Sequence, residues 1–376
     1  MSLTLPTPGD GTLAALRTRY LRRTARLLLE PPSGPPWLVA AHASVRDALA
    51  GVLTRSAGDF YGALLLPQVG GPIHAGDLGE AIPQLLTELA RRRVLGPEGV
   101  WWHGPVRRLV SPVLGVVNDF GVERAGMVFH DGEVEVAPGE IWPLDGAGAR
   151  VFHPMRQGGW FAEVDNNPLA TVEAHPDKEG NALSLGTASV AEWVAALDAA
   201  RALIRTALPA LADEHRSLLA MVVPVGGPME RSLSASYQEV IGLVYVSLHP
   251  SPLKMAEALV HEVQHNKLNL VAHVDPLLVD GGAGLYPSPV RPDPRPLWGV
   301  MLAVHAFLPV AAMFRALAEQ GHPLAATEGF RVRFREVLDV NHDGMAVVRE
   351  HARPTELGAR LVAEMDRLET EQWGWG

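Results

Sequence analysis

Cysteine is absent from this 376-residue sequence. Its absence excludes disulfide bonds, thiolate metal ligands and a cysteine nucleophile. It also leaves the redox environment of the protein undetermined, because paired cysteines are the usual sequence sign of an oxidising compartment.

The chain also lacks an excess of basic residues and a long apolar run. Its 42 acidic residues outnumber its 32 basic ones, the net charge is −10, and no basic block offsets it. Nucleic acid is therefore a poor candidate partner. No stretch approaches about eighteen uninterrupted apolar residues, and the N-terminus has no basic region followed by an apolar one. We expect a cytoplasmic protein that does not associate with a membrane.

The residues that are present predict an α+β fold. A hydrophobic content of 47% supports a large buried core. Residues 1–97 carry helical patterning interrupted by proline and glycine, which predicts a helical N-terminal region. Short apolar runs separated by Asp-Gly and Pro-Gly turns then favour β-hairpins over residues 101–165. We expect a mainly helical N-terminal part and a second region, residues 98–376, with a β-rich beginning and two long helices.

The segment HEVQH, residues 261–265, is a candidate metal site. A helix turns about 100° per residue, so His261 and His265 lie one turn apart with both imidazoles on one face. That is a geometry for two metal ligands. HExxH is typical of zinc peptidases, in which Glu262 would activate a metal-bound water as general base.

The helix that carries this motif is predicted over about residues 252–273. Ser251 is a candidate N-cap, and Pro252 occupies the first helical position, where a missing N–H costs nothing. The apolar residues of the helix cluster on an arc away from the two histidines. We therefore expect one side of the helix to be buried and the other to face a site.

A third protein ligand is expected, because two histidines alone hold a catalytic metal poorly. The sequence does not continue the motif as HExxHxxGxxH. Asp275 and Asp280 remain open, as in peptidases with an aspartate ligand. His305 is the candidate we favour. It lies in a second apolar helical segment, where Pro309 cannot bond the carbonyl of residue 305 and should kink or loosen the helix.

A family resemblance lies in two longer stretches, YQEVIGLVYVSLHPSPLKMAEALVHEVQHNKLNLV and YPSPVRPDPRPLWGVMLAVHAFLPVA. They resemble the HEXXH motif domain proteins, 2-oxoglutarate-dependent peptide β-hydroxylases that accompany ribosomally synthesised, post-translationally modified peptides. The clear resemblance covers about residues 230–320, and residues 160–186 match more loosely. The combination HExQHNKLN with SPxRPDPRPL is far more specific than HExxH alone.

This resemblance implies a mononuclear Fe(II) enzyme that uses 2-oxoglutarate and O₂ to hydroxylate a side-chain β-carbon in a precursor peptide. Three protein ligands leave three positions on an octahedral iron, two for 2-oxoglutarate and one for O₂. The distal carboxylate of 2-oxoglutarate suits a planar guanidinium. Arg291 and Arg295, on the proline-rich segment before the second helix, are the candidates. The two metal-bearing helices would then belong to a catalytic region.

The role of Glu262 differs among the possible functions. The usual non-haem iron oxygenase has two histidines and one carboxylate, whereas His261, His265 and His305 give three histidines unless Glu262 coordinates. Hydroxylation needs no general base, so Glu262 would be a ligand, an orienting group or a substrate contact. Two alternatives remain: a zinc metallopeptidase with Glu262 as base, and a non-catalytic metal-binding partner of a peptide maturation enzyme.

The sequence gives weaker indications about the roles of two other charged residues of the motif helix. Glu257 lies one turn before His261 and could hydrogen-bond a ligand ring nitrogen. Lys267 points away from His265 and is expected to be structural.

Overall fold

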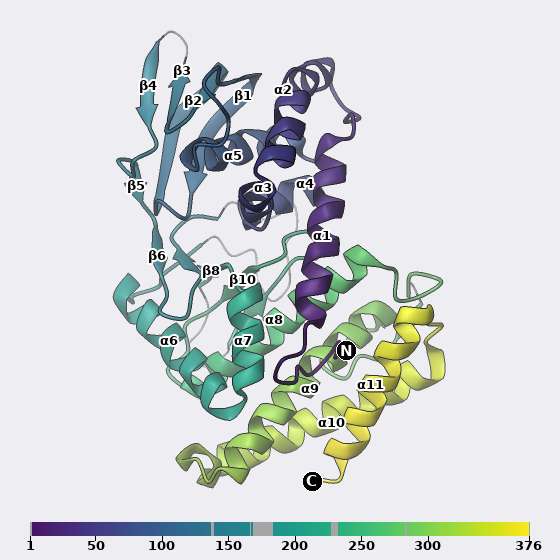
Figure 1. The fold of residues 1–376 in the computed structure, drawn as a ribbon. Helices are drawn as coiled ribbons and strands as arrows, with labels where there is room; N and C mark the ends of the chain where they lie inside the picture. The colour runs from purple at the N-terminus through teal and green to yellow at the C-terminus, as the bar shows by residue number, and fades with distance from the viewer. Residues whose placement is uncertain are drawn as a thin grey trace.

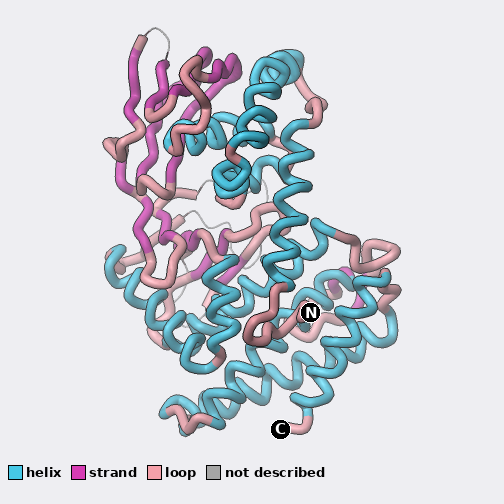
Figure 2. Tube along the Cα trace, in the orientation of Figure 1, coloured by secondary structure: helices cyan, strands magenta, loops and turns pink. Residues whose placement is uncertain are grey.

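The computed structural model of the chain describes residues 2–136, 139–165, 167, 183–226, 232–282 and 284–375. Residues 166 and 168–182 of the loosely similar segment 160–186 lie outside the described residues. The described part confirms the α+β fold, with helical parts towards both ends of the chain and strands between them (Figures 1 and 2).

The N-terminal part is helical, as its patterning predicted. The strongly amphipathic segment before Gly96 forms a helix in which Asp77 caps the first turn by accepting from the N–H of Glu80 at 3.0 Å. The five helices are α1 (Thr12–Leu29), α2 (Pro36–Arg55), α3 (Ala57–Leu64), α4 (Pro67–His74) and α5 (Leu78–Arg91).

An antiparallel sheet follows, and it confirms the β-rich middle. Its strands are β1 (Val100–Ser111), β2 (Val116–His130), β3 (Glu133–Val136), β4 (Glu140–Pro143) and β5 (Ala149–Arg150). The order is β1-β2-β3-β4, and β5 pairs with the first residues of β2. Gly132 has φ +95° in the Asp-Gly turn between β2 and β3, a left-handed conformation that glycine adopts without strain.

A second, mixed sheet supports the helix that carries the HExxH motif. Its strands are β6 (Phe152–Pro154), β7 (Trp160–Ala162), β8 (Met221–Pro224), β9 (Ser234–Ala235) and β10 (Leu243–Val246), and two helices, α6 (Val190–Ala207) and α7 (Pro209–Leu218), precede β8. The order is β6-β7-β8-β10-β9. The fully apolar β10 is buried between β8 and β9, as expected of a central strand, and β9 lies at the edge.

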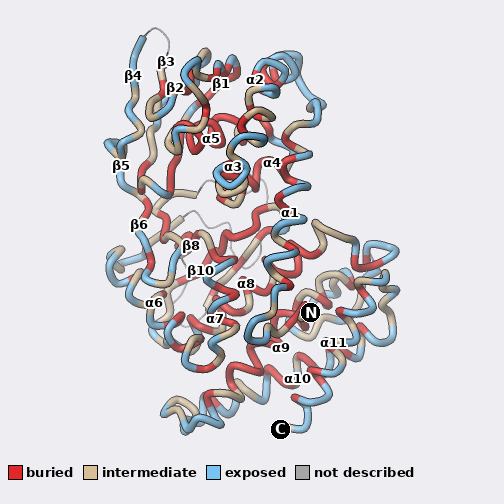
Figure 3. The backbone as a smooth tube through the Cα atoms, viewed as in Figure 1, coloured by how far each residue is buried: buried red, intermediate tan, exposed pale blue. Residues whose placement is uncertain are grey.

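The C-terminal part is again helical. It contains α8 (Pro252–Val274), β11 (Leu285–Tyr286), β12 (Arg295–Pro296), α9 (Leu297–Glu319), a 3₁₀ turn (Pro323–Ala326), α10 (Glu328–His351) and α11 (Glu356–Trp373). The predicted motif helix is α8, and Ser251 caps it by accepting from the N–H of Lys254 at 3.5 Å. Helix α8 packs against α1, α6 and α9, so the motif lies in the centre of the molecule (Figure 3).

Helix α9 is long and apolar enough to cross a membrane by length and composition alone. However, 83% of its most apolar window is buried inside the protein, so in this structure it is a core helix. The helix runs uninterrupted through Pro309, and the kink predicted near His305 does not end it. Packing on α8, α10 and α11 holds α9 together where the proline removes one backbone hydrogen bond.

Candidate metal centre

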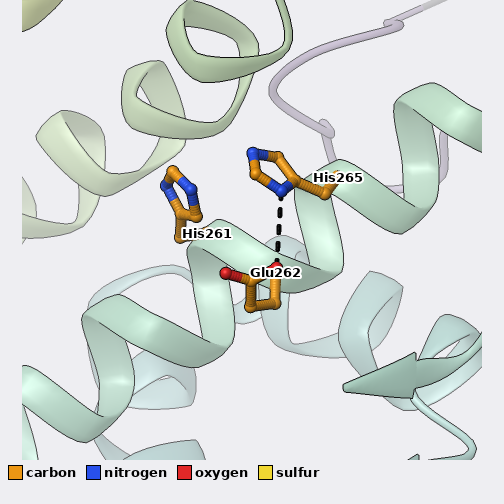
Figure 4. A group of neighbouring side chains, drawn as sticks. All are labelled: His261, Glu262 and His265. Carbon is orange, nitrogen blue, oxygen red and sulfur yellow. Dashed lines mark ion pairs between the residues drawn. The ribbon is translucent and has the colours of Figure 1, made fainter. Parts of the chain in front are cut away.

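Three side chains of α8 form a group that could hold a metal ion. His261, Glu262 and His265 each offer one ligand atom, and these atoms lie within 4.8 Å of one another (Figure 4). The two imidazole centroids are 4.2 Å apart, which confirms the shared helical face predicted from the i, i+4 spacing. Nδ1 of His265 lies 3.4 Å from Oε2 of Glu262.

The two histidines each have a nitrogen that suits a metal bond. Nδ1 of His261 and Nε2 of His265 are buried and have no hydrogen-bond partner among the described residues. Buried polar atoms are nearly always paired, so two orphaned nitrogens in one cluster indicate a ligand. A divalent cation that both nitrogens bind would satisfy them. Two imidazoles and one carboxylate are also a common donor set for such a cation.

The protonation states of the cluster agree with metal binding. Burial, aided by the neighbouring His265, lowers the pKa of His261 to about 3. The imidazole is therefore neutral near pH 7, which is the form that binds metals. Burial alone would raise the pKa of Glu262, but the adjacent His265 and other partners lower it to about 2, so Glu262 is ionised.

Glu262 is held by two hydroxyl groups from the edge of the second sheet. Ser234 donates to Oε1 and Ser236 donates to Oε2, each at 2.7 Å, and the carboxylate is only 2% exposed. Residues i and i+2 of a strand point to the same face, so the pair is placed by β9 and the residue after it. The sequence signal for this role is the alternation of Ser234 and Ser236, which places both hydroxyls on one face of the strand.

The structure does not bring His305 into the cluster. Its side chain is fully buried, and Nε2 lies 3.0 Å from the carbonyl oxygen of Leu3. One nitrogen of the imidazole that we predicted as the third ligand thus bonds the N-terminal segment, and its Nδ1 is buried without a hydrogen-bond partner among the described residues. Burial lowers the pKa of His305 to about 3. The carboxylate in the described cluster comes instead from Glu262, within the motif itself.

The two aspartates considered as peptidase ligands also lie outside the cluster. Asp275 is the residue that ends α8, and Oδ1 of Asp280 accepts from the backbone N–H of Gly282 at 3.0 Å in the following turn. Neither belongs to the group of clustered ligand atoms found in the described residues.

The remaining charged residues of α8 have structural partners. Glu257 does not bond a ligand imidazole, because its carboxylate accepts from Arg333 of α10 at 2.5 and 2.9 Å. Lys267 is structural, as expected: its buried Nζ lies 2.7 Å from Oε2 of Glu214 and donates to the carbonyl of Thr4 at 3.0 Å.

Arg291 and Arg295 line one cavity with the cluster. This cavity, the arginine chamber, has a volume of about 270 Å³, and the cluster residues His261, Glu262 and His265 all line it. Both guanidinium groups lie near Asp293, at 3.3 Å for Arg291 and 3.8 Å for Arg295. The proline-rich segment therefore places two arginines in the wall of the cavity that the cluster lines.

A second cavity, of about 340 Å³, adjoins the cluster on the side of α10. It shares Ser232, Ser234, His261 and Phe307 with the arginine chamber. The ring of Phe307 lies 4.5 Å from that of His261 and 5.9 Å from the Arg333 guanidinium carbon. Sequence reasoning missed Phe307 and Arg333 as site residues. Phe307 lies in an apolar helical segment that resembles a core helix, and nothing in the sequence links Arg333 to the motif.

No protein-family model and no curated protein matches this sequence. The family resemblance of the motif stretches therefore stays a prediction.

Proposed function

We propose that the protein is an Fe(II)- and 2-oxoglutarate-dependent dioxygenase that hydroxylates a side-chain β-carbon in a ribosomally synthesised peptide in the cytoplasm. One observation carries the proposal: Arg291 and Arg295 line the same cavity as His261, Glu262 and His265. A group of two histidines and one carboxylate is the donor set of non-haem Fe(II) oxygenases. A guanidinium beside such a group matches a co-substrate with a second, distal carboxylate.

The residues of the cluster would hold the iron, and the strand residues would orient them. Bound Fe(II), together with 2-oxoglutarate and O₂, supplies the oxidising chemistry. His261 and His265 offer the nitrogens that have no hydrogen-bond partner in the part of the chain that the structure describes. The hydroxyls of Ser234 and Ser236 keep the carboxylate of Glu262 in one orientation, which is a positioning role.

The arginine chamber would bind 2-oxoglutarate. Its two guanidiniums stand on a segment stiffened by prolines, so they lose little freedom when they bind a carboxylate. Asp293 lies close to both groups and limits the directions in which they point. Arginine is suited to this role because its planar fork can donate two parallel hydrogen bonds to one carboxylate.

A zinc peptidase remains the alternative, because the HExxH spacing fits it equally well. One observation makes it the weaker proposal. No aspartate of the following segment joins the described cluster.

Anaerobic binding of 2-oxoglutarate tests the proposal. Equilibrium dialysis should show that 2-oxoglutarate binds when Fe(II) is present, and Arg295→Ala should weaken this binding about tenfold or more, as expected for a lost charge-assisted pair. Arg331→Ala, which removes an exposed cation of α10, is the matched control. Binding that is independent of Fe(II), or Zn(II)-dependent cleavage of peptides, would contradict the proposal.

A further inference from the structure

The second cavity, on the side of α10, is formed by one stripe of α8. Lys254, Glu257, Ala258 and His261 all line it, and their spacing of i, i+3, i+4 and i+7 places them on one helical face. We call it the α10 chamber. Lys254 and His261 are separated by two turns, which is about 10 Å along the axis. The stripe therefore leads from an exposed lysine to one histidine of the metal cluster.

The opposite wall of the α10 chamber is held in place by an ion-pair network. Arg333 donates to Glu257 of α8 at 2.5 and 2.9 Å and to Glu336 of its own helix at 2.8 Å. This network joins α8 to α10 across the chamber, and the Arg333 guanidinium is bonded to a glutamate of each helix. Phe307 lies between Arg333 and His261 and forms the wall that the two chambers share.

The charges of the α10 chamber leave one cation available to a ligand. Lys254 and Arg333 balance Glu257 and Glu336, so the lining has no net charge despite the −10 of the whole chain. Arg333 is already bonded to both glutamates. The exposed side chain of Lys254 makes no ion pair within the described part of the chain. Its ammonium can therefore bind a carboxylate without breaking a bond to any of the described residues.

We infer that the α10 chamber binds the peptide substrate in an extended conformation, with Lys254 pairing to a peptide carboxylate. This inference deepens the proposed function and rests on it. The edge strand β9, whose Ser234 lines the chamber, suits an extended ligand. An extended chain advances about 3.3 to 3.6 Å per residue. Lys254 and His261 are about 10 Å apart along α8, which corresponds to about three residues of extended peptide. The acidic residue of the peptide should therefore lie about three positions from the peptide residue that reaches His261.

Paramagnetic relaxation from Mn(II) in the cluster tests this geometry without any turnover. The probe is the blocked heptapeptide acetyl-Thr-Ala-Val-Glu-Gly-Leu-Gln-amide, whose residues give distinct proton signals. Two analogues carry glutamine or lysine in place of the glutamate. We expect the strongest relaxation at a terminal residue, three positions from the glutamate. The glutamine analogue should bind about three- to fivefold more weakly, in the range of an exposed ion pair.

Variants of the lysine locate the recognition group. Lys254→Gln should weaken binding of the glutamate peptide about threefold and Lys254→Glu about tenfold, whereas Arg331→Gln on the outer face of α10 should not change it. If Mn(II) does not bind, the broadening of the peptide proton signals on binding to the metal-free protein gives the affinity ratios of the peptides and variants instead. Equal binding of the glutamate and glutamine peptides, preference for the lysine analogue, or no effect of Lys254→Glu would overturn the inference.

Failure of the inference and failure of the proposed function give different results. Formation of succinate from 2-oxoglutarate without any peptide depends on the cluster and the arginine chamber only. If succinate forms but the glutamate peptide shows no preference, the dioxygenase stands and the α10 chamber does not select acidic peptides. If the peptide binds as expected but Fe(II) supports no succinate formation, the peptide site stands and the proposed reaction is wrong.

Discussion

The hydroxyl of Ser236 donates a 2.7 Å hydrogen bond to Oε2 of Glu262, and the same oxygen lies 3.4 Å from Nδ1 of His265. One carboxylate oxygen thus connects a residue beside the edge strand β9 to the imidazole of His265, a candidate metal ligand. The hydrogen bond fixes the carboxylate, and the carboxylate in turn orients the ring. Orienting contacts of this kind tune metal affinity in proteins.

Ser236→Ala should therefore weaken metal binding. Removal of the hydroxyl leaves one oxygen of Glu262 without its orienting donor, and we expect the dissociation constant for Fe(II) or Mn(II) to rise about tenfold. Anaerobic titration calorimetry measures it. Ser288→Ala, a change in the arginine chamber away from the carboxylate, is the control. An unchanged constant in the Ser236 variant would show that the hydrogen bond does not orient the site.

His305→Ala and His265→Ala should affect different properties. The loss of the buried His305 imidazole removes its bond to the Leu3 carbonyl and leaves a cavity, which should lower the free energy of unfolding by about 2 to 4 kcal/mol. Metal content should stay close to one ion per chain. His265→Ala should lose the metal and retain most of its stability. Urea denaturation and metal analysis of both variants separate these roles, and metal loss in His305→Ala would restore that residue as a ligand.

Lys267→Met should destabilise the protein without changing the metal site. It leaves the carboxylate of Glu214 buried and unpaired, a situation that typically costs about 3 to 5 kcal/mol. Adding Glu214→Gln removes that charge, so the double variant should recover much of the loss. Denaturant unfolding measures both values. A single variant as stable as the unchanged chain would show that the ion pair adds nothing to stability.

Acid should destabilise the protein partly through His215. Burial lowers the pKa of this imidazole to about 3, whereas an unfolded histidine has a pKa of about 6.5. The unfolded state therefore binds the additional proton as the pH falls from about 6.5 towards 3, and stability decreases by up to about 1.4 kcal/mol per pH unit. Urea unfolding between pH 7 and 4.5 should show a smaller pH dependence for His215→Leu. Exposed His103→Gln should behave like the unchanged chain, and equal slopes for all three would refute the assignment.

The local patterns of the sequence were sufficient to predict much of the fold. Helix α8 begins at Pro252 after the Ser251 cap, as proposed, and the Asp-Gly turn at Gly132 joins two antiparallel strands. Both features depend on residues that are neighbours in the chain. The uninterrupted path of α9 through Pro309 was not predicted, because packing of the surrounding helices outweighs the local effect of one proline.

The candidate site was predictable where it lies on one helix. His261 and His265 share a face by helical geometry alone, whereas the two arginines were proposed from the family resemblance and its dicarboxylate co-substrate. The surroundings of His305 were not predictable in this way. His305 lies beside the carbonyl of Leu3, a contact between residues far apart in the sequence, which no periodicity reveals. The same limit applies to Arg333, whose bond to Glu257 joins two distant helices.

Succinate formation tests the central claim most directly. The purified protein is loaded anaerobically with Fe(II) and then given 2-oxoglutarate and O₂, with Zn(II) as the control metal. We predict slow succinate formation that requires Fe(II), disappears in His265→Ala and falls at least about tenfold in Arg295→Ala. No succinate with Fe(II), together with tightly bound zinc and Zn(II)-dependent peptide cleavage that Glu262→Gln abolishes, would contradict the dioxygenase and establish the peptidase.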